Sequence, residues 1–286
     1  MTRTLRLAIP NKGRLESNTA ALLRDAGLVF EKTERALSVN VHNVDLELLF
    51  VRADDIPEMI ADGVAELGIT GQDLLAEHGN GIPVLAELGY GRCRLVAAVP
   101  RNVEADKAED FAGFRVATSH PLVTSRFFAD RSIDVTVVPL KGSVEVAPKL
   151  DVADAVVDLV STGSTLMVNG LRQVGTILES QAVLAAGEAA LAQRHAEVDQ
   201  VATALSAVVA GRGKRYLLLN APHAAVEDMA EIIPGMESPT VVPLAEEGWV
   251  AVHSVVDADD VWNVLPDLKA LGGRDILVLR IQQLIA

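Results

Sequence analysis

The chain has 286 residues, half of them apolar, and a formal net charge of −14. Its length predicts two or three domains with ample core material. A field of this sign disfavours binding to nucleic acid or to an anionic membrane. Any phosphate site must therefore supply its own cations, backbone N–H groups or bound Mg²⁺.

Sparse cysteine and scattered histidines exclude further classes of site. Cys93 is the only cysteine, which rules out an internal disulfide framework and a cysteine-based zinc site. The six histidines show no paired metal-ligand spacing, so surface or packing roles are expected for them. No run of about 18 uncharged apolar residues occurs, and we expect a soluble, cytoplasmic protein.

Short apolar runs alternate with helical patterns in the first part of the chain. Strands are expected at Leu5–Ile9, Asp45–Val51 and Leu67–Thr70, and helices at Leu15–Ala26, from a cap at Asp54 or Asp55 to Ala61, and at Gln72–His78. This βαβα order predicts a mostly parallel sheet.

A second α/β unit is expected to begin near Arg92. Its strands are predicted at Leu95–Pro100, Arg115–Thr118, Val135–Pro139 and Ala155–Leu159, with a helix at Leu122–Asp130. Two such lobes leave a cleft between them. An Ala-rich helical stretch, Glu188–Val209, then leads into a predicted linker, Gly211–Lys214.

The remaining sequence predicts a ferredoxin-like domain. Its elements are expected in the order strand Tyr216–Asn220, helix Ala224–Ile233, strands Thr240–Pro243 and Trp249–Val256, helix Asp260–Leu271 and strand Asp275–Leu279. The order βαββαβ is typical of that fold. Such a unit has one open sheet face and carries no obvious chemistry, which favours a regulatory or assembly role.

The segment from Gly142 to Leu171 is the most informative about chemistry. An apolar strand containing Asp154 and Asp158 runs into a loop rich in hydroxyls and glycine, followed by a helix; the loop residues are Ser161, Thr162, Gly163, Ser164 and Thr165. Hydroxyls and open backbone N–H groups beyond a strand's carboxyl end suit a phosphate. The acids suit sugar hydroxyls or Mg²⁺, with Asp158 the first candidate and Glu145 and Asp154 next.

This segment resembles the signature of the ATP phosphoribosyltransferases. The resemblance is carried by Glu145, Ala153, Val156, Asp158, Leu159, Thr162, Gly163, Thr165 and Leu166. It departs from that pattern at Asp151, where the family has glycine. A carboxylate near the diphosphate or lost backbone freedom could weaken binding, or the loop tolerates the change. Further stretches similar to the long-form enzymes are Ala8–Arg14, Leu67–Gly71 and Glu237–Thr240.

The resemblance implies a fold and an assembly. It implies a two-lobed catalytic part like the periplasmic-binding-protein fold, a C-terminal ferredoxin-like (ACT-like) histidine-binding domain, Mg²⁺ dependence, and assembly of dimers into hexamers. The expected boundaries are residues 1–92 with 178–212 for the first catalytic domain, 93–177 for the second and 213–286 for the regulatory domain.

Candidate contacts for two further ligands follow. On the ATP side they are Asn11, Lys12, Gly13 and Arg14 after the first strand, joined through the resemblance by Arg52, Asp73 and Arg92. For L-histidine, the resemblance points to Asn220, Met236, Ser238, Thr240, Val255 and Asp275. The Mg²⁺ ligand is expected to be Asp158 or Glu145.

The implied reaction transfers the 5-phosphoribosyl group of phosphoribosyl diphosphate to N1 of ATP and releases pyrophosphate. It opens histidine biosynthesis, and feedback inhibition by L-histidine is expected. One alternative is a cytoplasmic small-anion binding protein, since two lobes with a Ser/Thr loop also describe solute binders. Another is a purine-base phosphoribosyltransferase, but the pair of adjacent acids usual there is absent, because Leu159 follows Asp158.

Overall fold

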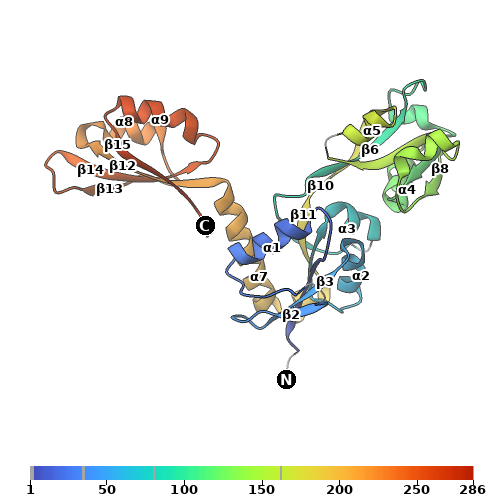
Figure 1. The fold of residues 1–286 in the computed structure, drawn as a ribbon, viewed down its shortest axis with the longest axis horizontal. Helices are drawn as coiled ribbons and strands as arrows, with labels where there is room; N and C mark the ends of the chain where they lie inside the picture. Colours follow the sequence, from blue (N-terminus) through green and yellow to red (C-terminus); the bar gives the residue numbers. More distant parts are fainter. Residues whose placement is uncertain (1–2, 34–35, 80, 162, 286) are drawn as a thin grey trace. The chain divides into compact units, whose positions relative to one another are not determined.

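The computed structural model describes residues 3–33, 36–79, 81–161 and 163–285. The chain forms two compact units, drawn in Figure 1. The first runs through Ala21 and includes Leu28–Ala202; the second comprises Leu22–Gly27 and the chain from Thr203 onward. None of the described helices is long and apolar enough to span a bilayer.

The first unit contains two sheets, and we name the part of the chain around each sheet a lobe. Lobe I has the strand order β2-β3-β1-β4-β11-β5, with bounds Ser38–Asn40, Leu46–Val51, Leu5–Pro10, Leu67–Gly71, Ala182–Ala186 and Val84–Glu87. Its helices include α1 (Glu16–Asp25), α2 (Ile56–Ala61) and α3 (Gln72–His78). Strand β1 pairs in parallel with β3 and β4, so the carboxyl ends of these three strands share one edge of the sheet.

Lobe II is built from the intervening chain. Its strand order is β10-β6-β9-β7-β8, with bounds Leu171–Ser180, Cys93–Pro100, Ala155–Val160, Arg115–Thr118 and Thr136–Pro139. The lobe also carries α4 (Pro121–Ala129), the short helix α5 (Ser164–Val168) and the 3₁₀ helix η3 (Val144–Leu150). Strand β9 lies in the interior of this sheet, antiparallel to β6 and parallel to β7.

The second unit has the predicted βαββαβ order. Its elements are β12 (Lys214–Pro222), α8 (Val226–Ile232), β13 (Thr240–Pro243), β14 (Trp249–Asp257), α9 (Val261–Ala270) and β15 (Arg274–Arg280). The sheet order β13-β14-β12-β15, antiparallel throughout, is that of the ferredoxin-like fold. The α/β fold class, with two lobes and this C-terminal unit, is therefore confirmed.

Two predictions in the connection between the units were wrong. The stretch Glu188–Val209 is not one helix but α6 (Glu188–Gln193) and α7 (His195–Arg212), because Arg194 leaves the helical conformation and its guanidinium binds the carbonyl of Arg3. The predicted linker Gly211–Lys214 is instead the end of α7 and the start of β12. Gly211 serves close packing, since a Cβ there would lie 2.9 Å from the carbonyl oxygen of Ile281.

Local details also differ from the sequence interpretation. Strand β10 was missed because register shifts between Gln173 and Gly175, and again between Thr176 and Leu178, interrupt its alternation. Strand β11 was missed because an alanine-rich run favours a helix by propensity, whereas complete burial in the sheet makes it a strand. The acids expected to cap α2 make no side-chain cap; a 3₁₀ turn, Ala53–Asp55, precedes that helix instead.

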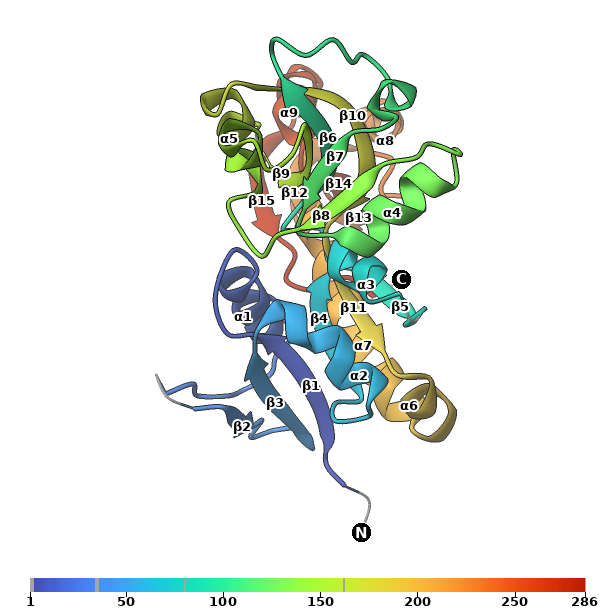
Figure 2. The ribbon, with the colours of Figure 1, turned by 90° about the vertical axis from the view of Figure 1, so that its right-hand side faces the viewer.

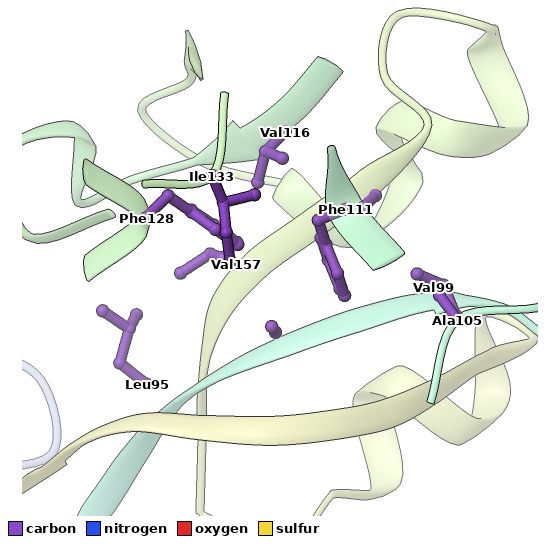
Figure 3. Close-up of a cluster of buried hydrophobic side chains, with 10 residues drawn as sticks. Leu95, Val99, Ala105, Phe111, Val116, Phe128, Ile133 and Val157 are labelled. Atoms are coloured by element: carbon purple, nitrogen blue, oxygen red, sulfur yellow. The ribbon is translucent and has the colours of Figure 1, made fainter. Parts of the chain in front are cut away.

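Aromatic rings anchor the core of lobe II (Figure 3). Phe111 and Phe128 are 0% and 1% exposed, with ring centroids 5.5 Å apart, and they pack with Leu95, Val116 and Val157. Burial of aromatic and aliphatic side chains removes apolar area from water at about 25 cal/mol per Å². This core fixes β9 and therefore the loop that follows it.

We expect Phe111→Ala to destabilise lobe II by about 3–5 kcal/mol, because it removes a buried ring and leaves a cavity. Urea unfolding measures the loss. The matched control is Val168→Ala on α5, where the side chain is 82% exposed and the change should stay within about 0.5 kcal/mol. Equal stability of the two variants would contradict the assigned core.

Candidate active site

Asp158 lies near the carboxyl end of β9, directly before the last two residues of the strand. Its Oδ1 accepts a hydrogen bond of 2.8 Å from the backbone N–H of Leu159. Burial raises the pKa of Asp158, and the charge of Glu145 raises it further, while the Leu159 N–H and the charge of His120 lower it in part. Glu145 thus adds its negative charge to the surroundings of Asp158.

The predicted phosphate loop follows directly. Ser161, Ser164 and Thr165 are exposed, and Gly163 has φ of 81° immediately before α5. A backbone in this left-handed region favours glycine, so Gly163 sets the turn that leads into α5. Thr162, the remaining loop residue named from the sequence, lies outside the described residues.

Asp154 occupies the other end of β9. It forms an ion pair of 2.8 Å with Arg115 Nη2 and also accepts hydrogen bonds from the Arg115 backbone N–H and Nε. These contacts hold the pKa of Asp154 below its ordinary value. At about 3.3 Å per residue, Asp154 is roughly 13 Å from Asp158 along the strand.

Asp151 adopts the conformation that glycine would favour. Its φ is 59°, at the end of η3, and its side chain is fully exposed, 3.7 Å from Arg115. The residue therefore stands with Asp154 at the amino end of β9, away from the phosphate loop. The structure therefore shows at Asp151 the left-handed backbone conformation that favours glycine.

Most of the ATP-side candidates line one cavity. This cavity, of about 380 Å³, is lined by Lys12, Gly13, Arg14, Leu15, Arg52, Ala53, Asp54, Gly71, Asp73, Leu74 and Leu159. Parallel pairing places the residues that follow β1, β3 and β4 at one edge, and the Asn11 N–H bonds the carbonyl of Val51 at 2.7 Å. Leu159 comes from lobe II, so both lobes contribute to the wall.

A second cavity adjoins the phosphate loop. It has a volume of about 530 Å³ and is lined by Gln72, Glu87, Arg92, Cys93, Arg94, Val160, Ser161, Glu179, Ser180 and Gln181. Arg92 and Ser161 thus share a site. Leu159 lines the first cavity and its neighbour Val160 lines the second. The two cavities therefore flank the carboxyl end of β9.

Asp73 is almost completely buried, with 1% exposure, and forms part of the wall of the first cavity. Ser180 Oγ donates to its Oδ1 at 2.5 Å, His120 Nε2 lies 3.4 Å from its Oδ2, and Arg14 Nη2 lies 3.9 Å from Oδ1. Burial alone raises the pKa of Asp73, but these partners outweigh it and hold the pKa below its ordinary value. Gly71 makes room for this carboxylate, since a Cβ there would lie within van der Waals overlap of Asp73 Oδ1.

Sequence reasoning assigned no role here to His120 or Ser180. His120 is 3% exposed, so the expected surface or packing role becomes a buried polar one. Its position in the sequence could have indicated a role at the site, because His120 follows the carboxyl end of β7 as Asn11 follows that of β1. Among the described residues, buried side-chain atoms without a hydrogen-bond partner of normal geometry are Asn11 Oδ1, His120 Nε2 and Gln181 Oε1. Buried polar atoms usually have a hydrogen-bond partner, so each of these three calls for a specific explanation.

The expected histidine contacts lie in the second unit. Strand register places Asn220, Thr240 and Val255 on the sheet face opposite the helices, since the alternate residues Leu219, Val252 and Val256 are buried beneath them. Asn220 Nδ2 donates to Asp275 Oδ2 at 3.0 Å. Met236 and Ser238 are exposed in the connection that precedes β13.

The donor set near the loop suits Mg²⁺. In the described part of the chain, no group of at least three His, Cys, Asp or Glu side chains is arranged to hold a metal. Mg²⁺ typically takes one or two protein carboxylates and completes its shell with water and substrate phosphates. Asp158 and Glu145 offer carboxylates of this kind, and a bound cation would offset the effect of the Glu145 charge on Asp158.

Two α/β lobes with cations and a Ser/Thr/Gly loop at their junction define a class of protein suited to a phosphorylated substrate. The ATP phosphoribosyltransferase family profile matches residues 52–207, and the HisG C-terminal domain profile matches residues 211–283. The chain therefore belongs to the ATP phosphoribosyltransferase family, a family of pentosyltransferases, in its long form with the additional C-terminal domain. This membership replaces both alternatives left open by the sequence.

Individual relatives agree. An ATP phosphoribosyltransferase of Gemmatimonas aurantiaca is 46% identical over 291 residues, covering 98% of this chain and 99% of the relative. One from Cytophaga hutchinsonii is 39% identical over the whole of both chains. The solved ATP phosphoribosyl transferase (HisG:HisZ) complex from Thermotoga maritima matches with a TM-score of 0.63 and 30% identity, over 72% of this chain and 98% of that chain.

The backbone at Asp151 generates a stability prediction. Asp151→Gly should be more stable than Asp151→Ala by about 1 kcal/mol, because the left-handed region penalises a Cβ. Thermal unfolding of the two variants measures the difference, and turnover should match that of the parent in both. An alanine variant as stable as the glycine variant would contradict the backbone assignment.

Proposed function

We propose that this chain catalyses Mg²⁺-dependent transfer of the 5-phosphoribosyl group from phosphoribosyl diphosphate to N1 of ATP, the first step of L-histidine biosynthesis, with L-histidine as feedback inhibitor. The observation that carries the residue assignment is the meeting of Lys12, Arg14 and Arg52 with the carboxyl end of β9 in one cavity. That cavity offers cations within a chain of net charge −14.

The loop is the proposed binding site for the 5′-phosphate of the donor. Hydroxyls of Ser161, Thr162, Ser164 and Thr165 and the backbone N–H groups around Gly163 supply donors that compensate a phosphate dianion. Asp158 and Glu145 face the sugar, where carboxylates accept hydrogen bonds from vicinal hydroxyls. Asp154, engaged by Arg115, holds the start of β9 in this proposal.

On the other side, Lys12 and Arg14, with Asn11 and Gly13, receive the triphosphate of ATP together with Arg52, and Arg92 serves the second cavity. N1 of adenine attacks the ribose C1 as the bond from C1 to the diphosphate oxygen breaks, and pyrophosphate leaves. Asp158 and Glu145 stabilise the positive charge that develops on the sugar. Bound Mg²⁺, held through Asp158 or Glu145, would neutralise the leaving diphosphate. Positioning of the two substrates supplies the rest.

We assign catalytic domain I to residues 1–92 and 178–212, catalytic domain II to 93–177 and the histidine-binding regulatory domain to 213–286. The open sheet face that carries Asn220, Thr240 and Val255 supports a small-ligand site in the latter. Assembly from dimers into hexamers and a cytoplasmic location complete the proposal.

Asp158→Asn should lower kcat by about 100-fold or more, because the amide keeps the shape but removes the charge that stabilises the transition state. Mixing enzyme, Mg²⁺, ATP and phosphoribosyl diphosphate and following product absorbance measures turnover. Asp134→Asn, at an exposed aspartate of lobe II, is the matched control and should retain full activity. Undiminished turnover of Asp158→Asn would remove the assignment.

The same variant should unfold at a higher temperature than the parent at pH 7. The folded-state pKa of Asp158 is raised, so its ionised form costs stability above that pKa, and the cost disappears as pH falls through it. The two melting temperatures should therefore converge in acid. The acid limb of the parent's kcat/KM should lie above the ordinary aspartate range near pH 4.

Calorimetry tests the regulatory site. Millimolar L-histidine should give heat of binding and inhibit turnover, and Asn220→Ala should weaken binding by about tenfold through loss of a polar contact. Asn263→Ala, at an exposed position on α9, is the control. Absence of binding heat in the parent chain would exclude the proposed inhibitor.

A further inference from the structure

Helices α3 and α4 join the two lobes. Helix α3 follows β4 in lobe I, and α4 follows β7 in lobe II; they lie close together (Figure 2). Their approach is tight, because a Cβ at Gly79, just beyond α3, would lie 2.6 Å from Leu122 Cδ2 on α4. Gly79 also has φ of 78°, which favours glycine there for a second reason.

Glu77 on α3 supplies the N-terminal cap of α4. Its Oε1 and Oε2 accept hydrogen bonds of 2.8 and 2.9 Å from the backbone N–H groups of Leu122 and Val123. Helix α4 has no side-chain cap from its own N-cap residue, His120. A carboxylate from the other lobe thus satisfies the first N–H groups of α4 and interacts favourably with its dipole.

His120 makes the second contact between the lobes. Its partner on α3 is Asp73, which lies one helical turn before Glu77. The ring is held in lobe II, where Nδ1 lies 2.9 Å from Ser119 Oγ and the backbone N–H donates to Thr118 Oγ1 at 2.9 Å. Its Nε2 faces Asp73 Oδ2 of lobe I at 3.4 Å, with both side chains almost completely buried. Asp73 in turn stands beside Arg14, whose Nη1 donates to the carbonyl of Gly91 at 3.0 Å.

These contacts reach the proposed chemistry from both lobes. Arg14 and Asp73 line the first cavity, to which lobe II contributes Leu159, the neighbour of Asp158. A shift of α4 relative to α3 would therefore separate the cations of lobe I from the acids of lobe II. Misplacement of about 1 Å costs an enzyme up to about 100-fold in rate.

We propose that His120 and Glu77 are positioning residues of the transfer reaction: they fix lobe II against lobe I and, through Asp73, orient Arg14 in the ATP cavity. This inference rests on the proposed function. Neither residue touches substrate. Their effect is on the placement of ATP relative to the donor sugar, not on the phosphate loop, which belongs wholly to lobe II.

The test compares His120→Leu with His120→Gln and Glu77→Gln. The leucine variant should raise KM for ATP and lower kcat by about tenfold each, whereas binding of ribose 5-phosphate, measured by calorimetry, should change less than about twofold. Glutamine at position 120 keeps an N–H donor for Asp73 and should restore both constants to within about threefold. Glu77→Gln retains an acceptor but loses the charge, so it should give an intermediate loss. His42→Leu, at an exposed histidine of lobe I, is the control.

Unchanged KM for ATP in His120→Leu would overturn the inference. So would loss of ribose 5-phosphate binding and folding to the same degree in His120→Leu and His120→Gln, since that pattern means a purely structural role. If the parent chain itself formed no product, the proposed function would fail instead, and the two failures are therefore distinguishable.

Discussion

A chain with a formal net charge of −14 binds polyphosphates only where local cations and backbone N–H groups outweigh its own field. Strands β1, β3 and β4 end at one edge of their sheet, where Lys12 and Arg14 follow β1 and Arg52 follows β3, and there we propose the ATP site. In lobe II, the loop of hydroxyls and glycine after β9 is the phosphate site that we propose. The proposed site thus gathers positive charge within a molecule whose net charge is negative.

The acids of the proposed site are controlled by burial and by partners. Burial raises the pKa of Asp73, but His120, Ser180 and Arg14 together hold it below its ordinary value, and Gly71 leaves the space that the carboxylate needs. At Asp158, burial and the like charge of Glu145 raise the pKa, and the Leu159 N–H and the charge of His120 offset this only in part. Asp73 is therefore engaged in contacts within the protein, whereas we propose that Asp158 binds a sugar or a cation. Opposite environments for neighbouring acids are a common basis for separate roles.

Sequence reasoning predicted the parts of the fold whose signals are local. Strands such as β1 and β4, the βαββαβ order and the loop after β9 all follow from periodicity and turn residues. It missed β10, whose bulges disrupt alternation, and it misread Gly211 as a breaker because close packing against Ile281 is not visible locally. At the site, Lys12, Arg14 and Arg52 were predicted and do share a cavity. The contact of His120 with Asp73 spans two lobes, and no local pattern encodes it.

We propose that the loop around Gly163 binds the sugar phosphate while Asp158 faces the ribose. A crystal structure of the chain with phosphoribosyl diphosphate tests it most directly. We expect the 5′-phosphate within hydrogen-bonding distance of the backbone N–H groups next to Gly163, with the ribose hydroxyls directed at Asp158 or Glu145. A 5′-phosphate bound instead among Lys12, Arg14 and Arg52, with the loop unoccupied, would contradict it.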